Sequence, residues 1–404
     1  MPFDVDAIRS RYPALTEGYI HFDNAGGSQV AAPVADAVAA TMRAAVSNRS
    51  SAFEPGRRSG EIVAGARHAL ADLLGAAPQG IVIGPSATAL TYRTARALAD
   101  TWRPGDEIVV SRLDHDSNVR PWVQLAARTG VTVRWAECDR ATGGLPVAQY
   151  RDLVGERTRL VALTAGSNAN GAAPDVAAIT AIARAAGALT YVDGVHSAPH
   201  HHTDVAALGA DFYVTSAYKW SGPHIAAVAA DPAVWERLRP MKLAPSPESV
   251  PDRFELGTAS FEQLAGVTAA VDHLASLVPS ASTMRRDRLA ASFEAVAQHE
   301  SSLLTRLTDG LAALPGITVL PGGEVGRRCP TVSFRLADQP PARTAALLGE
   351  RRICVSAGDY YAYEYFERLG LRDSGGAVRA SIYHYTTEAE VDLLLGAISD
   401  LAPR

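Results

Sequence analysis

The sequence contains few cysteines. Cys138, Cys329 and Cys354 are the only three in 404 residues. Their spacing matches no metal-ligand motif and no disulfide framework, and a sparse, odd number is typical of a protein from a reducing cytoplasm. The histidine run at 200–202 does not change this expectation, because three consecutive side chains cannot converge on one ion. We therefore expect a cytoplasmic protein with no metal site.

Long apolar runs and positive charge are also scarce. No run reaches the roughly 18 apolar residues of a membrane span, and the N-terminus carries acids early where a signal peptide would be apolar. The net charge is −5, whereas proteins that bind nucleic acids or anionic membranes usually carry a basic excess. The sequence thus predicts no membrane and no nucleic-acid partner.

The chain is longer than the size at which one hydrophobic core usually stops growing, so we expect two domains. Short β-rich runs alternate with alanine-rich helical stretches between residues 80 and 230, and one such helix is predicted at 175–188. The runs lie at residues 80–84, 106–111, 131–137, 159–165, 188–194, 211–216 and 225–230. This alternation predicts an α/β domain with a mostly parallel seven-stranded sheet, covered on both faces.

The pattern changes after residue 262. A long charged helix is predicted at 283–314, followed by a strand pair and further helices. Thr387 and Glu390 form a capping box that predicts the start of the last helix. We therefore expect a large domain at 21–262 and a smaller α+β domain at 263–404, with an N-terminal segment at 1–20 packing on the small domain.

One lysine has unusual neighbours. Lys219 lies between Tyr218 and Trp220. An isolated lysine more often reaches out to solvent, but a lysine held among apolar groups becomes a usable nucleophile. Asp193 ends the preceding predicted strand, where a buried acid could pair with a protonated ring nitrogen. Pyridoxal phosphate (PLP) needs both a Schiff-base lysine and such an acid.

Other polar residues are predicted to lie at the same edge of the sheet. Ligands of open α/β sheets bind at the carboxyl ends of the strands. Ser216 ends one predicted strand, and Asn168 follows another. Ala87 and Thr88 lie at a predicted helix start, whose N–H groups suit a phosphate, although most strand–helix turns bind nothing.

These segments resemble the class V aminotransferase family of PLP enzymes, which has fold type I, and in particular its cysteine desulfurase-like and selenocysteine lyase-like branch. The resemblance extends over nearly the whole chain. The segments that carry it, in order, are "YIHFDNAGGSQ", "LDHDSNVRPW", "GSNANGAAPD", "YVDGVHSAPH", "TSAYKWSGPH", "RFELGT" and "VRASIYHYTTEAEVD".

The resemblance implies roles around the cofactor. Lys219 would form the Schiff base and shuttle the α-proton, Asp193 would pair with the pyridine nitrogen, and His115 would stack on the ring. Two residues would hydrogen-bond the ring hydroxyl: Asn168 and His196. Four would hold the phosphate: Ala87, Thr88, Ser216 and Tyr218. Thr258, with Gly257, would reach the phosphate of a neighbouring subunit, which implies a homodimer with shared active sites.

The resemblance also implies an amino-acid substrate. Arg379 would bind its carboxylate, because a planar guanidinium suits a carboxylate, and Asn24 and Tyr360 would lie beside it. A second acid–base group would come from the aromatic residues near the C-terminus. The candidates are Tyr360, Tyr361, Tyr383 and His384.

The chain departs from the family pattern at one decisive position. A desulfurase needs a thiolate that becomes a persulfide, and Tyr361 stands where relatives carry that cysteine. We therefore expect a carbon–sulfur lyase that acts by β-elimination on a cysteine-derived amino acid. The alternatives are a class V epimerase or aminotransferase, a true cysteine desulfurase, and a PLP-binding protein without turnover.

Overall fold

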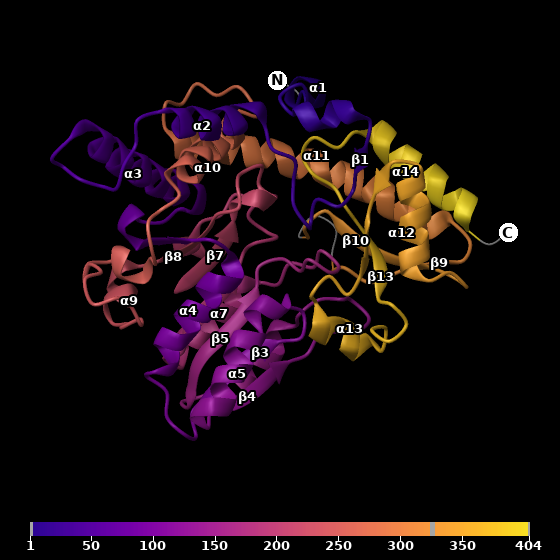
Figure 1. The fold of residues 1–404 in the computed structure, drawn as a ribbon. Helices are drawn as coiled ribbons and strands as arrows, with labels where there is room; N and C mark the ends of the chain where they lie inside the picture. Colours follow the sequence, from indigo (N-terminus) through magenta and orange to yellow (C-terminus); the bar gives the residue numbers. More distant parts are fainter. Residues whose placement is uncertain (1–2, 324–327, 403–404) are drawn as a thin grey trace.

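A computed structural model describes residues 3–323 and 328–402 of the chain. Its largest sheet has seven strands in the order β2-β8-β7-β6-β5-β3-β4 (Figure 1). The strands are β2 (Ile81–Gly84), β3 (Glu107–Ser111), β4 (Thr132–Ala136), β5 (Thr158–Thr164), β6 (Leu189–Asp193), β7 (Phe212–Ser216) and β8 (Ala226–Ala230). Six of these strands run in the same direction, and β8, which pairs with β2 and β7, runs opposite to them. The predicted mostly parallel seven-stranded sheet is confirmed.

Both faces of this sheet are buried. Successive side chains of a strand point to opposite faces, so in β5 Leu160 packs into one layer and Val161 into the other. The helices on the Leu160 face are α4 (Ala87–Ala99) and α5 (Arg120–Thr129). Those on the Val161 face are α3 (Glu54–Leu74), α7 (Val176–Ala185) and α10 (Phe261–Leu274). Burial on both sides explains why the strands appear in the sequence as nearly continuous apolar runs.

The C-terminal part forms a four-stranded antiparallel sheet in the order β12-β13-β10-β9. Its strands are β9 (Ile317–Val319), β10 (Thr331–Leu336), β12 (Ser356–Gly358) and β13 (Ala377–Ser381). Helices α12 (Pro341–Glu350), α13 (Tyr363–Leu369) and α14 (Glu388–Leu401) accompany it. The predicted capping box begins α14, since Thr387 Oγ1 accepts from Glu390 N at 3.2 Å and Thr387 N donates to Glu390 Oε2 at 2.9 Å.

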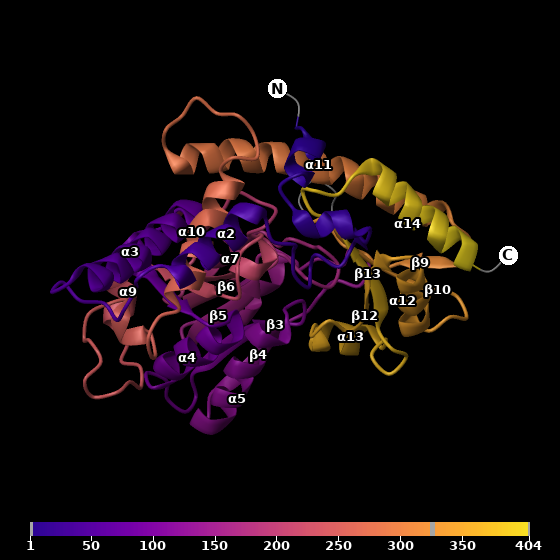
Figure 2. The ribbon, with the colours of Figure 1, turned by 45° about the horizontal axis from the view of Figure 1, so that its top comes forward.

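Two segments connect these parts. Helix α11 (Arg285–Ala313) runs across the molecule from the region of α10 to α14 (Figure 2). Near the N-terminus, β1 (Ile20–His21) pairs in parallel with β11 (Ile353–Cys354), and Phe22 is buried in the core of the C-terminal part. The predicted domain boundary after residue 262 falls at the start of α10, which packs against α2 (Ala32–Arg43) and α3 of the large part. The division into domains stays a prediction.

The shorter helices lie in the connecting segments. They are α1 (Val5–Arg9), α6 (Tyr150–Leu153), α8 (Val205–Leu208) and α9 (Pro232–Glu236). Over residues 3–323 and 328–402, the structure has no helix long and apolar enough to cross a membrane.

Candidate active site

A small pocket opens at the carboxyl edge of the large sheet. Asp193 is the last residue of β6, and the turn after β7 carries Lys219. Strand ends of a parallel sheet share one edge, so these residues meet although they are far apart in the sequence. The predicted residues that line this pocket are Ala87, Thr88, His115, Asn168, Asp193, His196, Tyr218 and Lys219.

Lys219 is buried in this pocket. It ends a 3₁₀ turn (Ala217–Lys219), is 7% exposed, and its Nζ donates a hydrogen bond to the carbonyl oxygen of Ala25. Burial, reinforced by the positive charge of Arg379, lowers the pKa of the amine to about 7, while Asp193 opposes the shift. A large share of the amine is therefore neutral and nucleophilic near pH 7.

Asp193 provides a buried carboxyl group beside the lysine. It is 5% exposed, and its Oδ1 accepts from Val195 N at 2.9 Å. Burial raises its pKa to about 6, whereas the Val195 N–H and Lys219 favour the charged form. A cationic partner would compensate this buried charge, as the protonated nitrogen of a pyridine ring does.

The two histidines of the pocket are held in fixed orientations. His115 Nδ1 accepts from Ser117 N at 3.1 Å, which places the ring proton on Nε2. Burial lowers the pKa of His115 to about 3, so the ring is neutral. His196 Nε2 lies 2.9 Å from Thr331 Oγ1 of β10, a contact with the C-terminal part that the sequence did not predict.

The end of the pocket where the resemblance implies a phosphate, called the anion end below, lies at the start of α4. Ser86 caps this 13-residue helix by accepting from Ala89 N at 3.1 Å, and Ala87 and Thr88 form its first turn. The hydroxyl of Ser216 is buried and has no hydrogen-bond partner among the described residues. The helix start in the pocket lining and an unsatisfied hydroxyl three residues before Lys219 each suit a phosphate, although Ser216 itself is not among the lining residues.

Arg379 lies at the other end of the site. It is 3% exposed in β13; its Nη1 donates to the Asn168 carbonyl at 2.9 Å, and its Nη2 donates to Ser356 Oγ at 3.2 Å. Its Nε has no partner among the described residues. The ring of Tyr360 lies 4.4 Å from the guanidinium, and the Tyr360 carbonyl accepts from Asn168 Nδ2 at 2.9 Å. The part of the chain with the seven-stranded sheet and the C-terminal part therefore contact each other around Arg379.

Two predicted site residues are engaged elsewhere. Asn24 donates to the carbonyls of His21 and Ser381, and its Oδ1 accepts from Tyr385 OH, so its amide has no free edge for a substrate. His384 is fully buried, and its Nε2 lies 2.7 Å from Tyr12 OH. It does not line the pocket. The structure places both side chains behind the site.

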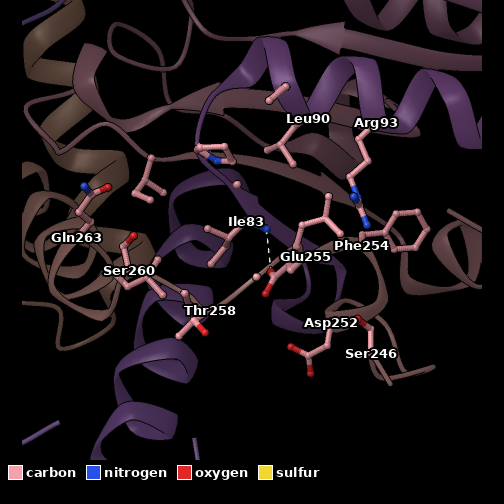
Figure 3. Close-up of a pocket in the computed structure, with 18 of the residues that line it drawn as sticks. Ile83, Leu90, Arg93, Ser246, Asp252, Phe254, Glu255, Thr258, Ser260 and Gln263 are labelled. Carbon is pink, nitrogen blue, oxygen red and sulfur yellow. Dashed lines mark hydrogen bonds between the residues drawn. The ribbon is translucent and has the colours of Figure 1, made fainter. Parts of the chain in front are cut away.

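Thr258 lines a separate hollow of about 870 Å³ (Figure 3). Gly84 and Pro85 line this hollow, and they directly precede Ser86 and the start of α4, which form the anion end of the small pocket. Glu255 holds its wall by accepting from Ile83 N at 2.9 Å, the dashed contact in Figure 3. Within the described chain, Thr258 is therefore beside the site but not in it.

The sequence analysis did not predict that Ser28 and Ser221 hold the lysine turn from behind. Ser221 has φ of +65°, and its N–H donates to Ser28 Oγ at 2.8 Å. Its hydroxyl lies 2.8 Å from Tyr12 OH and 3.1 Å from Tyr383 OH. The N-terminal segment and the C-terminal part thus both fix the backbone two residues after Lys219.

A mostly parallel sheet with a buried lysine and acid at its carboxyl edge is the arrangement of PLP enzymes of fold type I. The residues present fit this cofactor. The buried Ser216 hydroxyl needs a partner, Asp193 needs a cation, and the Lys219 amine is available as a nucleophile.

Comparison with known proteins identifies the family. The sequence pattern of the family named Aminotransferase class-V matches residues 20–394. An uncharacterized protein of Mycobacterium tuberculosis is 35% identical and covers 99% of this chain and 100% of its own. A probable cysteine desulfurase of Pseudomonas aeruginosa is 32% identical over 95% of both chains. The crystal structure of the cysteine desulfurase CsdA of Escherichia coli matches with a TM-score of 0.85 and 28% identity, covering 99% of this chain and 98% of that one.

The chain therefore belongs to the class V aminotransferase family. It is a cysteine desulfurase-like, PLP-dependent enzyme, as the sequence motifs predicted.

Proposed function

We propose that the protein is a carbon–sulfur lyase that releases a thiol from a cysteine-derived amino acid by β-elimination. The observation that carries this proposal is the position of Tyr361. Its side chain lies beside the pocket, with its ring centroid 5.6 Å from that of His115, where a desulfurase would need a thiol. A phenol cannot accept and hold sulfur as a persulfide.

None of the three cysteines replaces that thiol. Cys329 and Cys138 are buried, and burial raises the pKa of both. Cys354 lies in β11, away from the pocket lining, and burial and Asp23 raise its pKa as well. Because the thiolate is the reactive form of cysteine, these residues are poor sulfur acceptors.

The residues of the site support removal of an α-proton. PLP, when bound, supplies an electron sink for the charge left on the α-carbon. Arg379 would hold the substrate carboxylate, and the neutral Lys219 amine would take the α-proton. Asp193 would keep the pyridine nitrogen protonated, while the neutral, fixed His115 ring would cover one face of the cofactor. With a sulfur leaving group on the β-carbon, the products are a thiol and an enamine acid that hydrolyses to pyruvate and ammonia.

The test measures pyruvate and alanine separately after incubation of the holoenzyme with L-cysteine and S-substituted cysteines. Pyruvate with the matching thiol, without alanine, is expected. Lys219→Ala should abolish it, and Lys242→Ala, which changes the chain's other lysine, should not. Alanine with transferred sulfur would establish a desulfurase instead. Exchange of the α-proton in heavy water without either product would indicate an epimerase, and a keto acid that retains the substrate's sulfur would indicate transamination.

We also propose that the enzyme is a homodimer with shared sites. The hollow that holds Thr258 adjoins the anion end, and its rim exposes Met241 and Leu243, which are 80% and 65% exposed. Such apolar exposure suits a subunit interface. A mixed dimer tests it, because a dimer of one Lys219→Ala chain and one Thr258→Val chain would contain one intact site of two, and therefore about half of the wild-type activity, if Thr258 acts across the interface. No recovery in a verified mixed dimer would refute the sharing.

A further inference from the structure

Tyr361 has an unusual backbone and an unusual exposure. Tyr360 and Tyr361 have φ values of +51° and +60°, a left-handed conformation that is unfavourable for residues with a β-carbon. The Tyr361 side chain is nevertheless 73% exposed, so burial of its ring does not compensate for this backbone. Two strained residues in sequence, one of them an exposed aromatic, indicate a functional constraint on the segment.

Two hydrogen bonds to the pocket walls hold this segment. The Tyr361 carbonyl accepts from Asp116 N at 2.7 Å, directly after His115. The Tyr360 carbonyl accepts from Asn168 Nδ2 at 2.9 Å. The segment comes from the small part of the chain, between β12 and α13, yet both donors belong to the large part. The backbone at Tyr361 is therefore held beside the pocket, while solvent surrounds most of the ring.

The two tyrosine rings have different surroundings. The Tyr360 ring covers the guanidinium of Arg379, and its hydroxyl donates to the carbonyl oxygen of Ala377. Among the residues that the structure describes, the Tyr361 ring has one aromatic neighbour, His115, tilted by 30°. The segment thus extends from the proposed carboxylate site to the pocket wall, and a substrate held between Arg379 and Lys219 would have Tyr361 at its side-chain end.

We propose that Tyr361 is the platform on which the substrate's side chain stacks, and that the preferred substrates are cysteine derivatives with a flat aromatic group on sulfur. An exposed phenol ring on a held backbone offers an aromatic group a stacking partner, and the tyrosine side chain has only two rotatable bonds to order. Cysteine, with a bare thiol, would leave this ring uncovered. The release of a thiol from these substrates rests on the proposed lyase function, whereas their stacking on Tyr361 does not.

Binding of two ligands to the holoenzyme tests the platform. The carbon analogues of S-benzyl-L-cysteine and S-methyl-L-cysteine, in which a CH2 group replaces sulfur so that β-elimination cannot consume the ligand, are titrated separately, and the absorbance change of the bound cofactor gives the Kd of each. Wild-type protein should bind the benzyl compound more tightly, and Tyr361→Ala should reduce this preference about three- to tenfold, which is the range of an aromatic pair. Tyr361→Phe should keep the preference, since it retains the ring.

A control separates this effect from a general loss of surface tyrosine. Tyr19 is 41% exposed and lies near Arg352, so Tyr19→Ala should leave the ratio of the two Kd values unchanged. An unchanged ratio in Tyr361→Ala would overturn the platform, as would a loss in Tyr361→Phe as large as in Tyr361→Ala, which would point to the hydroxyl. Absence of pyruvate from every thio-amino acid would refute the proposed lyase but leave the Kd comparison valid.

Discussion

Capture of PLP by the apoprotein should depend on pH in a way that reports the burial of Lys219. Attack on the aldehyde requires the neutral amine, so the rate should rise with pH and level off above the pKa. With a pKa of about 7, about half of the amine is neutral at pH 7 and nearly all at pH 9, so the rate should rise only about twofold. An ordinary lysine would give a rise of about a hundredfold over the same range.

The assay is stopped-flow absorbance after mixing apoprotein with PLP at a series of pH values on both sides of pH 7; the rates of the wild type and Arg379→Leu are compared above pH 7, where the carboxyl of Asp193 has already ionised. Two variants test the causes of the shift. Arg379→Leu removes a positive charge that lowers the lysine pKa, so its midpoint should move to higher pH. Asp193→Asn removes a charge that raises that pKa, so its midpoint should move to lower pH.

The result that would refute the reasoning is a rate that keeps rising tenfold per pH unit up to pH 9. Such a profile would mean that the amine has an ordinary pKa and is not desolvated in the apoprotein. If the rate levels off but Arg379→Leu has the same midpoint as the wild type, burial remains the cause of the lowered lysine pKa and the charge of Arg379 is excluded as a cause. Lys242→Ala serves as the matched control, because Lys242 lies 2.7 Å from Glu248 and away from the pocket lining.

Three further changes have defined outcomes. Ser216→Ala removes the buried hydroxyl that a phosphate would satisfy, so the Kd of PLP should rise about tenfold or more by equilibrium dialysis, and an unchanged Kd would place the phosphate elsewhere. Tyr12→Phe leaves Ser221, His273 and His384 without their shared partner and should lower the free energy of unfolding by about 1–3 kcal/mol in urea titrations, whereas a loss below about 0.5 kcal/mol would mean that these groups find other partners. Ser356→Ala loosens Arg379, so KM for the amino acid should rise about two- to tenfold while the Kd of PLP stays constant; a parallel rise in both would contradict a role limited to the carboxylate.

The strands of the large sheet could be predicted because each of them produces a local pattern in the sequence, although their order in the sheet could not. Most of these strands are buried on both faces and therefore appear as short apolar runs between helices, as β5 and β6 show, whereas the edge strand β4 is only partly buried. Asp193 and Lys219 could be placed for the same reason, since each follows directly from the end of such a strand. In contrast, β12 has three residues and mixed burial, which leaves no clear period in the sequence.

The positions of Asn24 and His384 depend on contacts that no local pattern contains. Asn24 bonds Tyr385, 361 residues away, and His384 bonds Tyr12, 372 residues away. Both residues were predicted from motifs, and the segments that contain these motifs do lie near the pocket in the folded protein. The motif gives the neighbourhood, but only long-range packing decides which side chains face the pocket and which face the core behind it.

The geometry of Arg379 shows how the two ends of the site depend on each other. Its Nη1 is occupied by the Asn168 carbonyl, its Nη2 makes a longer bond to Ser356, and its Nε is buried without a partner among the described residues. A carboxylate would therefore approach along the edge formed by Nε and Nη2, where it would satisfy the Nε group and compete only with the longer bond. Asn168, which holds the opposite edge, also donates to the Tyr360 carbonyl and lines the cofactor pocket. A single residue of the large part thus sets the orientation of the arginine, anchors the strained segment and lines the pocket. If Arg379 binds the substrate carboxylate as proposed, recognition of the carboxylate and the position of the Tyr361 backbone depend on the same residue.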